Sequence, residues 1–163
     1  MDKELIKICK NAAEIASIPP QFNPEEWAGK EFNCYAYALR ICVDFRAYYG
    51  EIVPGFLTIG KNESYRDGPE AIVKLFKQDC QVLNLQVTET NLNEPINENE
   101  YRVAVYACIC RNYRDFHFIR QDSNGSWSHK RGWLNPIETY EKDILKNMGI
   151  YDFINIFKLT KKE

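Results

Sequence analysis

The pattern of apolar and polar positions divides the chain into a helical first part and a strand-rich second part. Residues 3–16 predict an amphipathic helix, because their apolar side chains recur at helical spacing. These apolar positions are Leu5, Ile6, Ile8, Cys9, Ala12, Ala13 and Ala16. Pro19 and Pro20 end this helix, and residues 17–32 are expected to form a loop.

A second helix is predicted to begin at Asn33, a favoured N-cap residue, which places Cys34 in its first turn. The segment 34–43 is apolar nearly all round, so this helix is expected at the centre of the core and to fade near Tyr49 and Gly50. A third helix is expected to start near Pro69 and to carry its apolar stripe over residues 70–79. A strand at 81–88 and a polar surface loop at 91–100 follow.

The second part carries the strongest strand signals. The near-continuous apolar run 101–110 predicts a central strand, and residues 115–121 and 126–131 predict a β-hairpin. A short helix is expected at 136–147 and an alternating last strand at 151–159. Helices followed by a mostly antiparallel sheet define an α+β fold.

Composition limits the classes of function. The 163 residues are expected to form one domain, residues 1–163, and the 45% of apolar residues is typical of a packed core. Twenty-one basic and 23 acidic residues give a net charge of −2, so charge gives no reason to expect nucleic acid or an anionic membrane as a partner. No apolar run is long enough to span a bilayer and no signal peptide is evident, so we expect a cytoplasmic protein, with export by a non-classical route left open.

Cysteine and histidine are the candidate chemical groups. Most of the six cysteines are expected to be small buried apolar residues, and Cys108 and Cys110 are expected to share one face of a strand. Cys34 is the cysteine whose context suits a nucleophile, because a helix N-terminus stabilises a thiolate. A thiol nucleophile requires a base, and the chain has only two histidines, His117 and His129, 12 positions apart in the predicted hairpin.

The turn of the hairpin decides whether the histidines cooperate. A two-residue turn at Asn124 and Gly125 puts His129 on the face away from His117, and Ser128 or Gln121 is then the better third residue. A three-residue loop with a left-handed Gly125 puts both histidines on one face as diagonal neighbours, roughly 7–8 Å apart at the backbone. We predict the three-residue loop, because type I turns favour Asp first and Gly fourth.

A cysteine opening a buried helix, then a strand histidine, then a polar residue on the next strand resembles the NlpC/P60 superfamily of papain-like thiol hydrolases. The resemblance covers residues 33–39 and 115–132, and the usual Asp-Cys-Ser-Gly of the family is Asn-Cys-Tyr-Ala here. It implies a papain-like fold, with Cys34 as nucleophile, His117 as general base and His129 orienting the base. It also implies hydrolysis of a peptide or amide through a thioester on Cys34, without a cofactor. An ion pair of Cys34 with His117 would make Cys34 the first cysteine to be alkylated at mildly acidic pH.

Other interpretations stay open. If Cys34 is not catalytic, it is a small buried thiol of the core. If the two histidines are not catalytic, they are ordinary polar residues of half-buried strands. Asp122 is a rival for the third position, although we expect it to cap its own turn. A three-ligand zinc site of Cys34, His117 and His129 and a papain-like binding module without activity are the alternative functions. The basic residues of the hairpin are expected on a solvated strand face: Arg120, Lys130 and Arg131.

Overall fold

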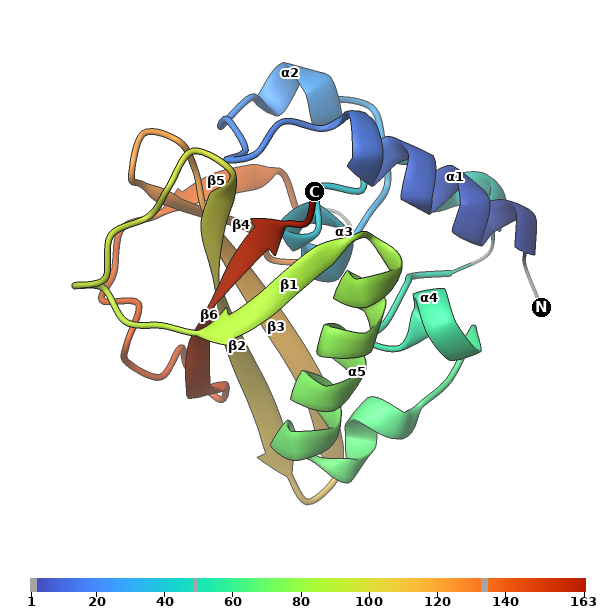
Figure 1. The fold of residues 1–163 in the computed structure, drawn as a ribbon. Coiled ribbons are helices and arrows are strands. Elements are labelled where there is room, and N and C mark those ends of the chain that lie inside the picture. The colour runs from blue at the N-terminus through green and yellow to red at the C-terminus, as the bar shows by residue number, and fades with distance from the viewer. Residues whose placement is uncertain (1–2, 49, 133–134) are drawn as a thin grey trace.

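The computed structural model describes residues 3–48, 50–132 and 135–163. Its helices lie against a six-stranded antiparallel sheet, so the expected α+β class is confirmed (Figure 1). The strands follow the order β1-β6-β2-β3-β4-β5 across the sheet, and each neighbouring pair is antiparallel. The C-terminal strand β6 therefore lies between β1 and β2, far from its sequence neighbour β5.

Most of the predicted elements form near their expected places. The five α-helices of the described residues are α1 (Lys3–Ile15), α2 (Pro24–Trp27), α3 (Cys34–Ala38), α4 (Phe56–Ile59) and α5 (Pro69–Val82). Short 3₁₀ turns occupy Phe45–Tyr48 and Ser64–Asp67. The strands are β1 (Leu85–Glu89), β2 (Glu100–Cys110), β3 (Tyr113–Gln121), β4 (Trp127–Lys130), β5 (Ile137–Tyr140) and β6 (Asp152–Lys161). The four-residue helix α2 interrupts the segment expected to be a loop.

The sheet buries both of its faces, one under the helices and one under the chain that follows β5. Successive side chains of a strand alternate between faces. On β2, Val103, Val105 and Ala107 therefore join the large core with the helices, whereas Ala104 and Tyr106 join a smaller cluster on the opposite face. The smaller cluster also contains Ile119, Tyr140, Ile144 and Ile156. Because β2 is buried on both faces, its sequence is continuously apolar.

Helix α3 is much shorter than expected. It begins as predicted, with the Asn33 side chain accepting a hydrogen bond from the Ala36 N–H at 3.0 Å, but it ends at Ala38. The N–H groups of Arg40 and Ile41 then turn back to carbonyls of the last helical turn, and Arg40 is left-handed at φ 64°. These two bonds define a Schellman stop. The helix was expected to fade near Tyr49 and Gly50, and Tyr49 lies outside the described residues.

The contacts of the Arg40 side chain explain why this residue, which is not a glycine, adopts the left-handed backbone conformation. Its guanidinium donates to the carbonyls of Ala13 and Ser17 at 2.6 and 3.1 Å, at the end of α1. The left-handed backbone costs about 1–2 kcal/mol. The hydrogen bonds from the buried Arg40 cation to these carbonyls offset part of that cost, since charged groups make the stronger bonds. Helix α3 thus ends early, and the residue after its C-cap attaches the end of α1 to the core.

The prediction of a short helix at 136–147 is wrong, because Ile137–Tyr140 forms strand β5 instead. Strand β4 exposes an unpaired edge, and β5 satisfies it from Trp127↔Tyr140 to Lys130↔Ile137. Pairing along the whole of a short strand outweighs a weak helical pattern, since propensity is easily overridden by tertiary context. This strand also supplies Glu138 to the candidate site.

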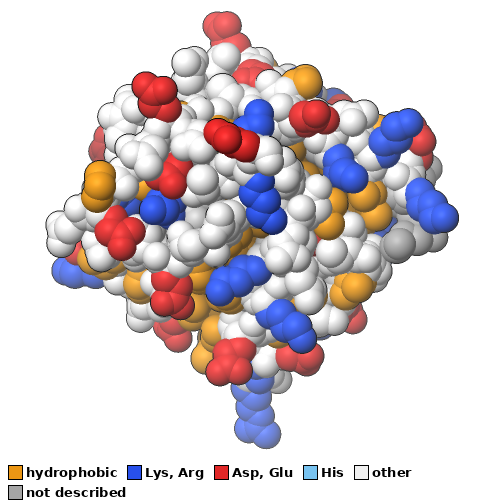
Figure 2. Space-filling model, viewed as in Figure 1, with side chains coloured by type: hydrophobic (Ala, Val, Ile, Leu, Met, Phe, Trp, Pro, Cys, Tyr) orange, Lys and Arg blue, Asp and Glu red, His pale blue; other side chains and the backbone are white. Residues whose placement is uncertain are grey.

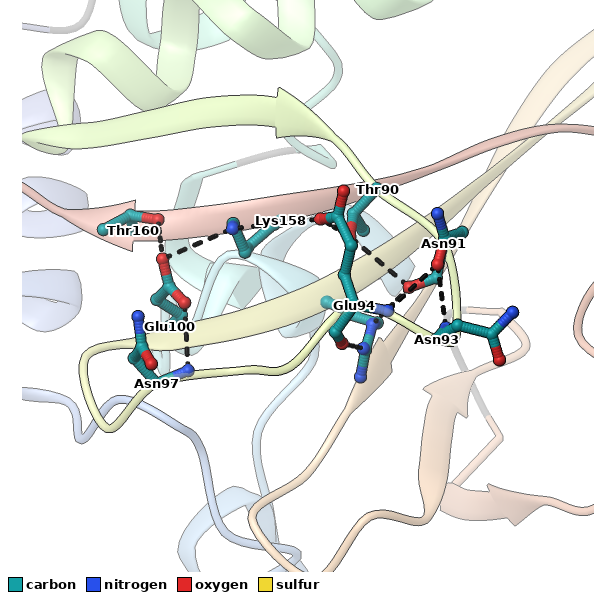
Figure 3. Close-up of polar contacts among 9 residues, drawn as sticks. Thr90, Asn91, Asn93, Glu94, Asn97, Glu100, Lys158 and Thr160 are labelled. Carbon is teal, nitrogen blue, oxygen red and sulfur yellow. Dashed lines mark hydrogen bonds and ion pairs between the residues drawn. The ribbon is translucent and has the colours of Figure 1, made fainter.

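The polar segment before β2 is a surface loop, as predicted, and a set of polar contacts attaches it to the sheet (Figure 3). Glu100 accepts hydrogen bonds from the Asn97 N–H at 2.9 Å and the Thr160 hydroxyl at 2.8 Å, and Lys158 lies 3.7 Å from its carboxylate. Glu94 accepts from the Thr90 hydroxyl at 2.7 Å. The loop therefore crosses the β1-β6-β2 side of the sheet in a defined position.

The outer surface carries both signs of charge. On the face shown in Figure 2, Lys and Arg side chains occur among Asp and Glu side chains, with apolar atoms visible between them. This agrees with the small net charge of −2. In the part of the chain that the structure describes, we find no helix that is both long and apolar enough to cross a membrane.

Candidate functional site

The hairpin closes with the predicted three-residue loop. Asp122 N–H donates to the Ser126 carbonyl at 2.8 Å, and Gly125 N–H donates to the Asp122 carbonyl at 3.0 Å. Gly125 is left-handed at φ 86°. This is a type I turn followed by a left-handed residue. The register continues as Gln121↔Trp127 and Arg120↔Ser128, so the two histidines share one face as expected.

The two imidazoles are hydrogen-bonded to each other. Nε2 of His117 lies 2.8 Å from Nδ1 of His129, and the rings meet edge to face at 5.0 Å between centroids. Nε2 of His129 lies 3.3 Å from a carboxylate oxygen of Glu138 on β5. Arg131 holds the same oxygen at 2.5 Å. Three residues from three strands thus form one chain of polar contacts.

Burial keeps both histidines neutral. Burial, with smaller contributions from His129 and Arg131, lowers the pKa of His117 to about 3. Burial also lowers the pKa of His129, although Glu138 opposes that shift. Both side chains are almost fully covered, at 5% and 2% exposure. At neutral pH each ring therefore carries one proton, on one of its two nitrogens.

The chain of contacts fixes where those protons sit. An ionised carboxylate only accepts, so Nε2 of His129 carries the proton donated to Glu138. Nδ1 of His129 is then an acceptor, and Nε2 of His117 must donate to it. Nδ1 of His117 is left unprotonated, with a lone pair. Among the described residues this nitrogen makes no hydrogen bond.

Cys34 lies at the edge of strand β3 next to Phe118, the residue that follows His117. Strand β4 pairs with β3 only at Arg120 and Gln121, and the two strands diverge beyond those positions. The Phe118 backbone lies close enough to the Cys34 sulfur to favour its thiolate form. The thiol is buried, with 7% of the residue exposed. Cys34 therefore lies beside the residue that follows His117.

The histidines and Cys34 approach β3 from different sides. Phe116 and Phe118 pack against Tyr35 of α3, with ring centroids 6.1 and 4.9 Å apart. Because side chains alternate along a strand, His117 points to the opposite face, where its ring lies 5.8 Å from that of Tyr151. Within the described residues, no hydrogen bond joins the Cys34 sulfur to either imidazole. The structure brings the two histidines together but leaves the expected thiol–imidazole bond unmade.

The electrostatics of Cys34 favour a protonated thiol. Burial raises its pKa well above that of a free thiol, the Phe118 backbone partly opposes this, and the Asp115 and Glu51 carboxylates raise it further. Helix α3 has five residues, so its dipole is small. The resting pair is a neutral thiol and a neutral imidazole. These pKa shifts disfavour the thiolate–imidazolium ion pair that preferential alkylation of Cys34 would require.

A buried polar network lies on the helix side of the hairpin, and the sequence interpretation missed it. Arg120 pairs with Asp122 at 2.9 Å, and Asp122 also accepts from the Ser128 hydroxyl at 2.6 Å. Ser128 in turn lies 2.6 Å from the Tyr37 hydroxyl. Asp122 thus does not cap its turn, where Asn124 accepts from the Ser126 N–H instead. Ser128 and Asp122 face α3, away from the histidine pair.

The expectation of a solvated basic face is also wrong for two of its three residues. Arg120 and Lys130 are 2% and 3% exposed, and only Arg131, with a side chain 58% exposed, meets solvent. The signal was present in the sequence, because Arg120 is two and four residues from Phe118 and Phe116 and shares their face. Lys130 lies close enough to Cys34 and Glu51 for their charges to raise its pKa, against the stronger lowering by burial.

A surface hollow of about 550 Å³ opens next to Lys130. Trp27, Phe32 and Ile137 form its apolar part, and Lys30 and Arg46 are among its charged lining residues. Lys130 lines the hollow and lies near the Cys34 thiol, so the hollow is on the side of the hairpin that carries Cys34.

Cys34, His117 and His129 do not come together as the alternative zinc site. Among the described residues, no group of three or more His, Cys, Asp or Glu side chains is placed to hold a metal ion. Comparison with known proteins assigns no class either: no protein-family model matches the chain, and neither a curated protein nor a solved structure matches it.

Proposed function

We propose that this chain is a papain-like thiol hydrolase related to the NlpC/P60 superfamily, cleaving a peptide or amide bond. The single observation that carries the proposal is the Glu138–His129–His117 chain of contacts, which leaves an unprotonated nitrogen on His117, the residue before the one that lies next to Cys34. A nucleophile, a base and an orienting group are the parts that such a reaction requires.

In this mechanism His117 is a general base rather than half of an ion pair. As the Cys34 sulfur attacks the substrate carbonyl carbon, Nδ1 of His117 takes the thiol proton, and the charge on its ring is stabilised by His129 and Glu138. The proton then passes to the leaving amine, and a thioester remains on Cys34. Water attacks that thioester, with His117 again acting as base, and releases the carboxylic acid.

The proposal requires the Cys34 sulfur and the His117 imidazole, which approach β3 from different sides, to come together. The thiol and the imidazole are not hydrogen-bonded in this structure, and catalytic hydrogen bonds often tighten only when substrate is bound. Strands β3 and β4 are paired at only two positions, so the gap beside Phe118 is the place where such a movement is least restrained. The substrate would enter from the hollow beside Lys130.

The test is acylation by an activated ester, because it requires no knowledge of the natural substrate. Wild-type protein treated with p-nitrophenyl acetate should gain an acetyl group on Cys34, measured by peptide mass mapping. His117→Ala should slow that acylation by about 10²–10⁴-fold, and Cys34→Ala should remove it. The matched control is Cys42→Ser, which alters a partly exposed thiol and should leave the rate unchanged. A screen of peptide, isopeptide and muropeptide amides then identifies the substrate; full turnover in Cys34→Ala would rule out the mechanism.

The alternative is a papain-like binding module without activity. The observation that favours it is the protonated, buried thiol of Cys34. A module of this kind predicts equal, slow acylation of Cys34 in wild type and in His117→Ala. The same experiment therefore separates the two functions.

A further inference from the structure

The far end of the β2–β3 hairpin holds a pair of thiols that the proposed hydrolase does not use. Cys108 and Cys110 are two residues apart on β2, so both point to the face that carries Tyr106 and the histidines. Their sulfur atoms are 3.3 Å apart. Cys108 is buried at 1% exposure, whereas Cys110 is exposed.

We propose that Cys108 and Cys110 are a dithiol site that a hydroperoxide oxidises reversibly to an intramolecular disulfide. The bond requires the end of the hairpin to bend. Residues i and i+2 of a regular strand are about 6.6 Å apart at Cα, but their side chains are parallel, so their Cβ atoms are further apart than the roughly 3.5–4.5 Å that a disulfide needs. The sulfurs already touch, so a local bend of the backbone at Cys110 brings them to bonding distance.

The position on the hairpin makes the required adjustment possible. Cys110 pairs with Tyr113, the last pair before the two-residue turn at Arg111 and Asn112, so its backbone is restrained on one side only. Cys108 is held by the sheet opposite Asp115, and its sulfur contacts the Tyr113 carbonyl at 3.6 Å. One thiol is thus accessible to a reagent from solvent, and the other is fixed beside it to resolve the product.

The chemistry balances in two steps. The thiolate of Cys110 attacks one oxygen of hydrogen peroxide, which breaks the O–O bond, forms a sulfenic acid and releases one water after proton transfer. The Cys108 sulfur then attacks the sulfenic sulfur, the S–O bond breaks, and the second water leaves with the thiol proton. Two thiols are oxidised, and one peroxide is reduced to two waters. A dithiol reductant reverses the result by thiol–disulfide exchange.

The remaining thiols do not compete for Cys110. Cys9, Cys34 and Cys80 are buried and Cys42 is partly covered, and no sulfur–sulfur contact other than that of Cys108 with Cys110 occurs among the described residues. Neighbouring groups set the pH range: the hydrogen bond shared with Cys108 and the negative charge of the Asp152 carboxylate raise the pKa of Cys110. Oxidation should therefore accelerate as the pH rises toward mildly alkaline values.

The experiment uses the full chain, reduced and then treated with hydrogen peroxide. Trypsin releases residues 103–111 as one peptide, which contains both cysteines of the pair and no other. After oxidation this peptide should be lighter by two hydrogens and should resist alkylation. Dithiothreitol should restore two alkylation sites. A peptide that is alkylated at both cysteines after peroxide treatment, or that is recovered mainly as a disulfide between two chains, would overturn the proposal.

Two variants test the separate roles. In Cys108→Ser the sulfenic acid on Cys110 should persist and react with dimedone, giving one adduct on the 103–111 peptide. In Cys110→Ser the buried Cys108 should give no adduct under the same conditions. The control Cys42→Ser should form the disulfide as wild type does. Equal dimedone labelling of both single variants would contradict the assignment of an exposed reacting thiol and a buried resolving thiol.

Discussion

His117 and His129 show how much one hydrogen bond at the residue scale can specify. Each histidine alone is a buried polar residue with two possible tautomers. Together with Glu138 they form a directional chain in which only one arrangement of protons satisfies every contact. That arrangement leaves Nδ1 of His117 without a proton, which is the state that the proposed role of a base requires.

The depressed pKa of His117 predicts loss of stability in acid. In the unfolded chain a histidine takes up its proton near pH 6.5, whereas folded His117 does so only near pH 3. Between these values the unfolded state binds more protons, so the free energy of unfolding should fall as pH falls. Urea unfolding at a series of pH values should show this slope, and His117→Gln should make it shallower. An unchanged slope in the variant would mean that His117 is protonated in the folded protein.

At the scale of elements, the turn of the β3–β4 hairpin determines the site. The left-handed Gly125 fixes the three-residue loop, and the loop fixes the register that places His129 on the face of His117. A shift of one residue would turn His129 toward the opposite face. The turn is therefore as important to the site as the histidines themselves.

Gly125→Ala is expected to destabilise the protein by about 1–2 kcal/mol. A Cβ at this position would meet no atom within 4 Å, so the cost comes from the φ angle of 86° and not from a clash. Gly125→Asn is the matched control, and it should lose less because Asn tolerates the left-handed region. Chemical denaturation measures both. Equal losses for Ala and Asn would show that the backbone angle is not the cause.

At the scale of the whole molecule, the buried network joins parts that are far apart in sequence. The Arg120 guanidinium donates to the carbonyls of Tyr37 and Gln21 at 3.2 and 3.0 Å, in addition to its pair with Asp122. It thereby connects the hairpin to α3 and to the loop that precedes α2. Every member of this network has partners, which is the condition under which a buried ionic group is tolerated.

Arg120→Met should destabilise the protein by about 3–5 kcal/mol, because it leaves the Asp122 carboxylate buried without its cation. Adding Asp122→Asn should recover part of that loss, since the uncompensated charge is then removed. The control is Arg46→Met, which breaks an exposed pair with Asp44 and should cost at most about 1 kcal/mol. Denaturant unfolding of the three variants measures these differences; a double variant no more stable than Arg120→Met would contradict the electrostatic explanation.

The sequence by itself determined the features that depend on local pattern. Helical spacing located α1 and α5, the continuous apolar run located β2, and turn chemistry at Asp122 and Gly125 predicted the loop that brings the histidines together. Asn33 was identified correctly as the cap of α3. In each case neighbouring residues carry the physical cause, so the signal is contained in a short window.

Only the tertiary structure decided which groups face one another across elements. Arg40 ends α3 because its guanidinium bonds to α1, and Ile137–Tyr140 becomes a strand because β4 offers an open edge. The tertiary structure also decided that His117 and Cys34 lie on different sides of β3. The alternation of side chains along a strand shows which residues share a face, but it does not show which face the helices cover. Burial, which sets the charge of Cys34 and of both histidines, is likewise a property of the packed molecule and not of any segment.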